Sequence, residues 1–177
     1  MKEIRLGRLG GLEISAVPSA FLGSLVLFLA LIAIALAFLN LSAGEAIIGA
    51  LVAAALYWIS DTVHQFGHAR AARQTGHPML GIRYWGVLSS SVYPADEPTL
   101  PAAVHIRRAL GGPTTSAVVT ILAAALVYAM RFAGVYGIIR WLALFFLLAN
   151  LFVFTLGPFL PLGFTDGSTL LHWRGKA

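Results

Sequence analysis

Hydrophobic residues fall into four long runs, and most polar and charged residues lie between them. The first run, residues 19–39, has 21 residues without a charge. As a helix rising about 1.5 Å per residue it would be roughly 30 Å long, the thickness of a bilayer's hydrocarbon core. Further runs cover about 46–70, the segment from Gly111-Gly112-Pro113 to Met130, and 136–156, beyond which Pro158 and Pro161 stop a helix. The pattern predicts four transmembrane helices.

Composition agrees with this pattern and narrows the possible chemistry. Of the 177 residues, 59% are hydrophobic and 11% are charged, whereas about a quarter are charged in soluble domains. We expect one membrane-embedded domain over 1–177. The first run is too long for a signal peptide, which predicts a retained helix. The chain has no cysteine, so any metal must be held by His, Asp or Glu.

The basic residues predict the orientation. With a cytoplasmic N-terminus, that side receives ten of the twelve and the other side only Arg131 and Arg140. The ten are Lys2, Arg5, Arg8, Arg70, Arg73, Arg83, Arg107, Arg108, Arg174 and Lys176. We therefore expect both termini to be cytoplasmic, in a multi-pass protein of a prokaryotic inner membrane. No basic stripe interleaved with aromatics indicates nucleic-acid binding.

The connection between the second and third runs, about 75–108, contains two β-like segments. Residues 82–88 and 91–93 are rich in β-branched and aromatic residues and are bounded by Gly and Pro, which predicts short strands. Asp96 and Glu97 are expected to be solvated loop charges. The predicted fold class is an all-α, polytopic bundle of about four spans with a small β element in the cytoplasmic connection.

Two histidines of the second run have the spacing of a metal site. His64 and His68, in His64-Gln65-Phe66-Gly67-His68, lie on one face of a helix about 5–6 Å apart, so both can reach one ion. The alternative is a pair of interfacial histidines hydrogen-bonded to their neighbours. Polar residues within a span are costly and usually functional, which favours the metal.

Asp166 is the candidate third ligand. It follows the fourth run, which returns the chain to the side where the second run ends, so the topology brings it to the depth of His64 and His68. Alternatively, Asp166 is the N-cap of a helix beginning at Gly167. Both roles are compatible.

These motifs resemble the site-2 protease family of intramembrane zinc metalloproteases. His64 and His68 match the paired histidines of its H-E-x-x-H motif, and Asp166-Gly167 matches its Asp-Gly motif. Gly112-Pro113 resembles a Gly-Pro of the intervening helix. The resemblance covers about residues 46–171. It implies Zn²⁺ held by His64, His68 and Asp166, and hydrolysis of membrane proteins or transmembrane peptides within the bilayer.

The chain departs from the family pattern at the general base. Gln65 occupies the glutamate position, and an amide cannot take a proton from water; losing a positioned base typically costs about 10²–10⁴-fold. Thr155 stands where many relatives have Asn, and the spacing from Pro161 to Asp166 is longer. A slow or inactive peptidase is therefore expected, or alternatively a pseudoprotease that binds transmembrane helices without cleavage. Gln65 is compatible with a natural inactive relative and with an engineered change.

Asp61 lies on the same helical face, three residues before His64. It is a candidate hydrogen-bond acceptor for a metal-bound histidine, a polar contact of the bundle, or a substitute base. A small transporter or channel using Asp61 and the histidines is a third class of function.

Val87 and Leu88 are the candidate substrate-binding residues. They belong to the apolar segment near His64, which is expected at the membrane surface. If it forms a strand with a free edge, an unwound substrate can pair with it. Alternatively, the segment closes the mouth of the bundle, with Trp85 and Tyr93 at the interface.

Overall fold

The computed structural model describes residues 3–176, so Lys2 of the basic set lies outside it. Five α-helices form: α1 Pro18–Phe38, α2 Ala43–Gln74, α3 Ala102–Phe132, α4 Ile138–Leu148 and α5 Asp166–Trp173. Helix α4 continues without a break into a π-helix, η1 Ala149–Leu156, and a 3₁₀ turn, η2 Gly157–Phe159. Helix α3 begins before the Gly-Gly-Pro segment, which the sequence had placed at its start.

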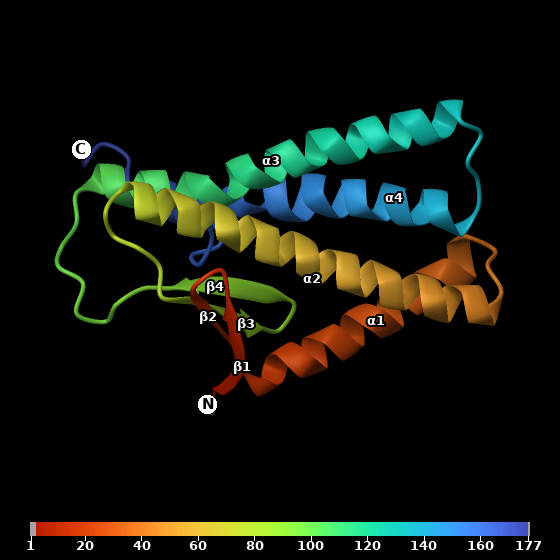
Figure 1. The fold of residues 1–177 in the computed structure, drawn as a ribbon, viewed down its shortest axis with the longest axis horizontal. Helices are drawn as coiled ribbons and strands as arrows, with labels where there is room; N and C mark the ends of the chain where they lie inside the picture. Colours follow the sequence, from red (N-terminus) through yellow and green to blue (C-terminus); the bar gives the residue numbers. More distant parts are fainter. Residues whose placement is uncertain (1–2, 177) are drawn as a thin grey trace.

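Within residues 3–176, four helical segments are long and apolar enough to cross a membrane: α1, α2, α3 and Ile138–Phe159. They lie side by side, and the α1–α2 and α3–α4 connections are at the end opposite the sheet and both termini (Figure 1). Large apolar side chains such as Leu22, Leu51 and Ile121 are more than 60% exposed, as a lipid-facing surface requires. The chain is an integral membrane protein, and the predicted fold class is confirmed.

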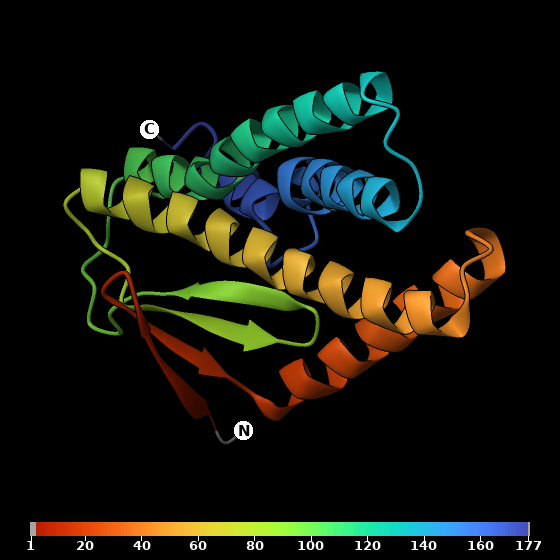
Figure 2. The ribbon, with the colours of Figure 1, turned by 45° about the vertical axis from the view of Figure 1, so that its right-hand side comes forward.

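The β element is a four-stranded sheet in the order β1 (Ile4–Leu9), β2 (Leu12–Ala16), β3 (Gly81–Trp85) and β4 (Leu88–Val92). The β1–β2 and β3–β4 pairs are antiparallel hairpins, and β2 joins β3 in parallel. Figure 2 shows the two hairpins beneath α2. The sequence predicted the β3–β4 region but not β1 and β2. It placed Val87 within a strand, whereas Val87 lies in the tight turn after Trp85.

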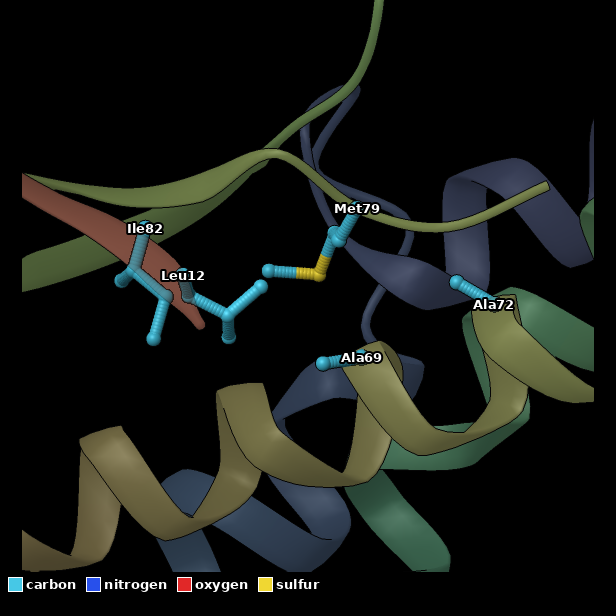
Figure 3. Close-up of a cluster of buried hydrophobic side chains, with 5 residues drawn as sticks. All are labelled: Leu12, Ala69, Ala72, Met79 and Ile82. Atoms are coloured by element: carbon cyan, nitrogen blue, oxygen red, sulfur yellow. The ribbon is translucent and has the colours of Figure 1, made fainter. Parts of the chain in front are cut away.

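The sheet is held against the last turns of α2 by a small apolar core. Ile82 and Leu12 from the sheet, Met79 from the connection, and Ala69 and Ala72 from α2 are each at most 5% exposed (Figure 3). The alanines have little bulk, so the strands approach the helix closely. This contact fixes β4 beside the polar face of α2.

The β3–β4 turn is also attached to the membrane helices. The Tyr57 hydroxyl of α2 donates a hydrogen bond to the Val87 carbonyl at 2.8 Å. On α1, Gly23 packs directly against the Gly86 backbone, where any side chain would collide with it. The tip of this hairpin is therefore held between α1 and α2.

Helices α2 and α3 cross in close contact through glycine. A Cβ on Gly111 would lie 2.5 Å from the Gly67 carbonyl oxygen, and a Cβ on Gly67 would collide with the Gly111 carbonyl. Pro113 lies inside α3 and supplies no N–H to the helical ladder. Glycine at the crossing lets the α3 backbone reach the histidines of α2.

A side chain accounts for the π-helical segment η1. Asn150, 1% exposed, donates from Nδ2 to the Phe146 carbonyl at 2.8 Å and to Ser60 Oγ of α2 at 2.9 Å. The side chain thus occupies the acceptor four residues back that an α-helix would give to a backbone N–H. The ladder shifts to five-residue spacing, and the Gly157 N–H bonds the Phe152 carbonyl.

Candidate functional site

One face of α2 is polar and buried in the bundle. Asp61, His64, Gln65 and His68 are each 3–6% exposed. The Nε2 atoms of His64 and His68 lie 3.0 Å apart, and the ring planes are 77° apart. The helical spacing therefore brings the two imidazoles to a common point, as the sequence predicted.

The outer nitrogens of the histidines are held by α3. His68 Nδ1 donates to the Arg108 carbonyl at 2.8 Å, because a carbonyl can only accept. His64 Nδ1 lies 3.0 Å from Ser116 Oγ. With Nδ1 protonated, the Nε2 lone pair of each neutral ring is directed toward the other ring. Asp61 supplies neither contact, so its predicted role as acceptor for a metal-bound histidine was wrong.

Asp166 reaches the same point from the other end of the chain. Its Oδ2 lies 3.6 Å from His64 Nε2 and 3.4 Å from His68 Nε2. It is the first residue of α5, and the N-cap is Thr165, so the N-cap alternative for Asp166 was wrong. Burial opposes ionisation of this carboxyl, but the two neighbouring imidazoles outweigh it and lower the pKa of Asp166.

Two contacts place α5. Gly167 packs against the Phe159 backbone, which leaves no room for a Cβ and explains glycine after the aspartate. At the other end, the Trp173 ring stacks on His105 of α3 with centroids 4.2 Å apart. Both contacts hold Asp166 over the histidines.

The separations of the three donors fit three corners of a tetrahedral metal site. Their separations of 3.0, 3.4 and 3.6 Å bracket the edge of a tetrahedron, about 3.3–3.6 Å for ligand distances of 2.0–2.2 Å. Two nitrogens and one carboxylate oxygen also form a ligand set of catalytic zinc. The residues present therefore fit the metal that the sequence suggested.

Gly112 forms the wall of this site on α3. A Cβ at Gly112 would lie 2.5 Å from His64 Nε2 and closer still to His68 Nε2. Any side chain there would occupy the space between the donors. The glycine of the Gly112-Pro113 pair is therefore required to keep the space between the donors open.

The side-chain amide of Gln65 is held by a hydrogen bond from strand β4. Its Oε1 accepts a hydrogen bond from Ser91 Oγ of β4 at 2.8 Å. This contact leaves the amide NH₂ as the donor group toward the cavity beside the histidines. Glutamate at 65 would present a second carboxylate oxygen in the same place.

The site opens into a cavity of about 600 Å³ between α2, β4, the start of α3 and the segment 153–169. One wall is apolar, with Trp85, Leu88 and Phe164 among its residues, whereas Asp61 and the serines of β4 form a polar side. Glu97, expected to be solvated, instead forms two hydrogen bonds with the buried Arg108 guanidinium. These bonds lower the pKa of Glu97.

Sequence analysis did not identify Ser116, Ser91 or the Arg108 carbonyl. Ser116 is four residues from Gly112 on one helix face, and Ser89 and Ser91 share one face of a strand, so their spacing could have indicated that they face the site. The role of the Arg108 carbonyl could not have been predicted, because every residue has a backbone carbonyl. Val87 does not line the cavity, whereas Leu88 does.

No protein-family model matches the sequence, and no curated protein does. A solved structure, the site-2 protease from Methanocaldococcus jannaschii, matches with a TM-score of 0.64 and 20% identity. The match covers 96% of this chain and 70% of that chain. Over 96% of its length, this chain has the fold of a site-2 protease.

Proposed function

We propose that the chain is a zinc-binding, site-2-protease-like membrane protein that captures an unwound segment of another membrane protein and cleaves it slowly or not at all. The convergence of His64, His68 and Asp166 beside a cavity of that fold carries the proposal. We also propose that residues 1–177 form one domain with both termini in the cytoplasm. Both ends of the chain lie at the same end of the bundle as the sheet (Figure 1), which supports placing them on one side of the membrane, and the ten basic residues of that side favour the cytoplasm.

His64 and His68 would hold the metal through Nε2 and Asp166 through Oδ2. Bound there, zinc would polarise a carbonyl and acidify water. Ser116 and the Arg108 carbonyl orient the imidazoles, and Gly112 keeps their donors free of a side chain. The apolar wall of the cavity excludes water from the segment that it holds.

Gln65 decides between cleavage and capture. Its NH₂ can donate to a peptide carbonyl, but the amide cannot accept a proton near neutral pH. The Ser91 contact fixes the amide for this donor role. This observation favours the second candidate function, a pseudoprotease that binds without cutting.

Strand β4 offers a way to hold an unwound segment. It is last in the sheet order, so one edge has no strand partner within residues 3–176. In a two-residue hairpin the closing pair, Trp85 and Leu88, is hydrogen-bonded, so Ser89 and Ser91 direct their backbone groups outward. We propose that the substrate strand pairs with this edge of β4 and contacts the side chains of Leu88 and, at the turn, Val87.

The substitution Gln65→Glu tests the proposal in protein reconstituted with zinc. We expect cleavage of an extended transmembrane peptide to rise by about 10²–10⁴-fold, since a carboxylate restores the general base. The matched control is Gln65→Glu combined with His68→Ala, which should remove both zinc and cleavage. Less than one zinc per chain in Gln65 protein would contradict the metal site. Zinc binding without any gain in Gln65→Glu would support capture alone.

A further inference from the structure

Asp61 is a buried carboxylate that the metal site does not use. It is 3% exposed, lies one turn before His64 on α2, and lines the cavity. Its Oδ2 has no hydrogen-bond partner among the described residues. Leaving a buried charged acceptor without a partner is costly, and such groups inside a membrane are usually functional.

The donors around Asp61 are engaged elsewhere. The Tyr57 hydroxyl bonds the Val87 carbonyl, and the Thr62 hydroxyl lies 2.6 Å from the Trp58 carbonyl. His68 Nδ1 is bound to the Arg108 carbonyl. Ser89 of β4 also lines the cavity, and its hydroxyl likewise has no partner in residues 3–176. The Asp61 carboxylate and the Ser89 hydroxyl, which can donate as well as accept, therefore face the same space.

The charges of the cavity leave Asp61 unbalanced. Its lining carboxylates are Asp61, Glu97 and Asp166. Arg108 binds both oxygens of Glu97, and Asp166 faces the histidines. The Arg108 guanidinium also donates to the His77 carbonyl and lies over the Tyr93 ring, so it is not free to turn toward Asp61. A cation entering the cavity would meet one carboxylate without a counterion.

We propose that Asp61 and Ser89 form a polar subsite that receives a lysine or arginine side chain of the captured segment. The inference rests on the proposed function, because it takes the cavity as the place where that segment lies. One helical turn separates Asp61 from His64, about 5–6 Å, and an extended chain advances about 3.3 Å per residue. The recognised residue therefore lies within about two residues of the peptide group beside the histidines.

The test uses the full chain in lipid nanodiscs and synthetic transmembrane peptides that carry one photocrosslinker. A panel places a single lysine at successive positions, and each peptide has a partner with norleucine, which keeps the length and removes the charge. We expect one position, or two adjacent ones, where lysine binds at least about tenfold more tightly than norleucine. Glutamate at that position should weaken binding.

Variants of the subsite assign the preference. Asp61→Asn should abolish it, Asp61→Glu should retain it, and Ser89→Ala should reduce it. Thr114→Ala is the control, because it removes a hydroxyl that lies outside the residues lining the cavity and donates to the Leu110 carbonyl of its own helix. Equal affinity for lysine and norleucine peptides at every position would overturn the subsite, as would an unchanged preference in Asp61→Asn. Loss of cleavage of norleucine peptides in Asp61→Asn would also count against it, and would indicate a substitute base.

Failure of this inference can be told apart from failure of the proposed function. The lysine preference is an affinity and does not require metal, whereas zinc content is measured separately by elemental analysis. Protein that binds zinc without a lysine preference would refute the subsite only. Protein with the preference but without zinc would refute the metal site only.

Discussion

Gly112→Ala is the most direct perturbation of the proposed metal centre, because it adds one methyl group and removes no ligand. The added Cβ would lie 2.5 Å from His64 Nε2 and closer to His68 Nε2. Ordinary van der Waals contact begins near 3.4 Å. The His64 ring must therefore move by at least about 0.9 Å, and the α2–α3 glycine contact leaves the backbone little freedom to absorb this.

The displacement is large for a metal site. Ligand distances are held within about 0.2 Å, and loss of a mere supporting contact costs about 10–100-fold in metal affinity. We therefore expect Gly112→Ala to weaken zinc binding by more than about 100-fold, as His64→Ala would. The helix itself should not suffer, since alanine is favoured over glycine in a helix interior by roughly 1 kcal/mol.

Zinc affinity is measured by competition with a chelator, and thermal unfolding is recorded in parallel. Gly44→Ala is the matched control: Gly44 is also helical, and a Cβ there would meet nothing within 4 Å. An affinity within threefold of the parent in folded Gly112→Ala protein would show that the histidines do not point their Nε2 atoms at a shared ion.

Three further predictions address the surroundings of the site. Trp173→Ala should lower zinc affinity by about tenfold, because the stack of Trp173 on His105 holds α5 in place. Trp173→Phe should retain most of the zinc affinity, since a ring is kept. Equal losses in the two variants would contradict an anchoring role for the stack. The Arg108 contact lowers the pKa of Glu97, so the ion pair should stabilise the fold above about pH 4.5 and lose this effect as the pH falls through the depressed pKa. Glu97→Gln should remove this part of the acid dependence of thermal unfolding. An unchanged profile would refute the stabilising role of the ion pair. In the cysteine-free chain, Lys176→Cys should react with an impermeant thiol reagent only from the cytoplasmic side, and labelling from the other side would reverse the proposed orientation.

The spans and the histidine pair were predictable because each depends on local periodicity. Charge-free runs of membrane length need no partner to be recognised, and the spacing of His64 and His68 fixes their common face once α2 is helical. Asp166 was placed by topology, since the fourth span must return to the side where α2 ends. These predictions used only chain direction and helical geometry.

The remaining features depend on contacts between distant segments. Strands β1 and β2 are short and carry charges, and β2 is paired with β3 across almost 70 residues, a separation that no local pattern reveals. Arg108 holds His68 through a backbone carbonyl, so its side-chain identity gave no signal. Glu97 looked solvated because its partner Arg108 is on the next helix. Pro113 suggested a helix start, yet tertiary packing tolerates it inside α3.

The π-helical segment before Pro158 has a consequence for how this region can change in length. A π turn holds one more residue than the α turn it replaces, so η1 stores extra residues between α4 and the chain that leads to Asp166. Removing one residue from 149–156 would let the segment relax to α-helical spacing with little change in where Gly157 leaves the bundle. The same deletion on the C-terminal side of Pro161 would pull Asp166 away from the histidines. Related sequences should therefore gain and lose residues in the first stretch and conserve length in the second.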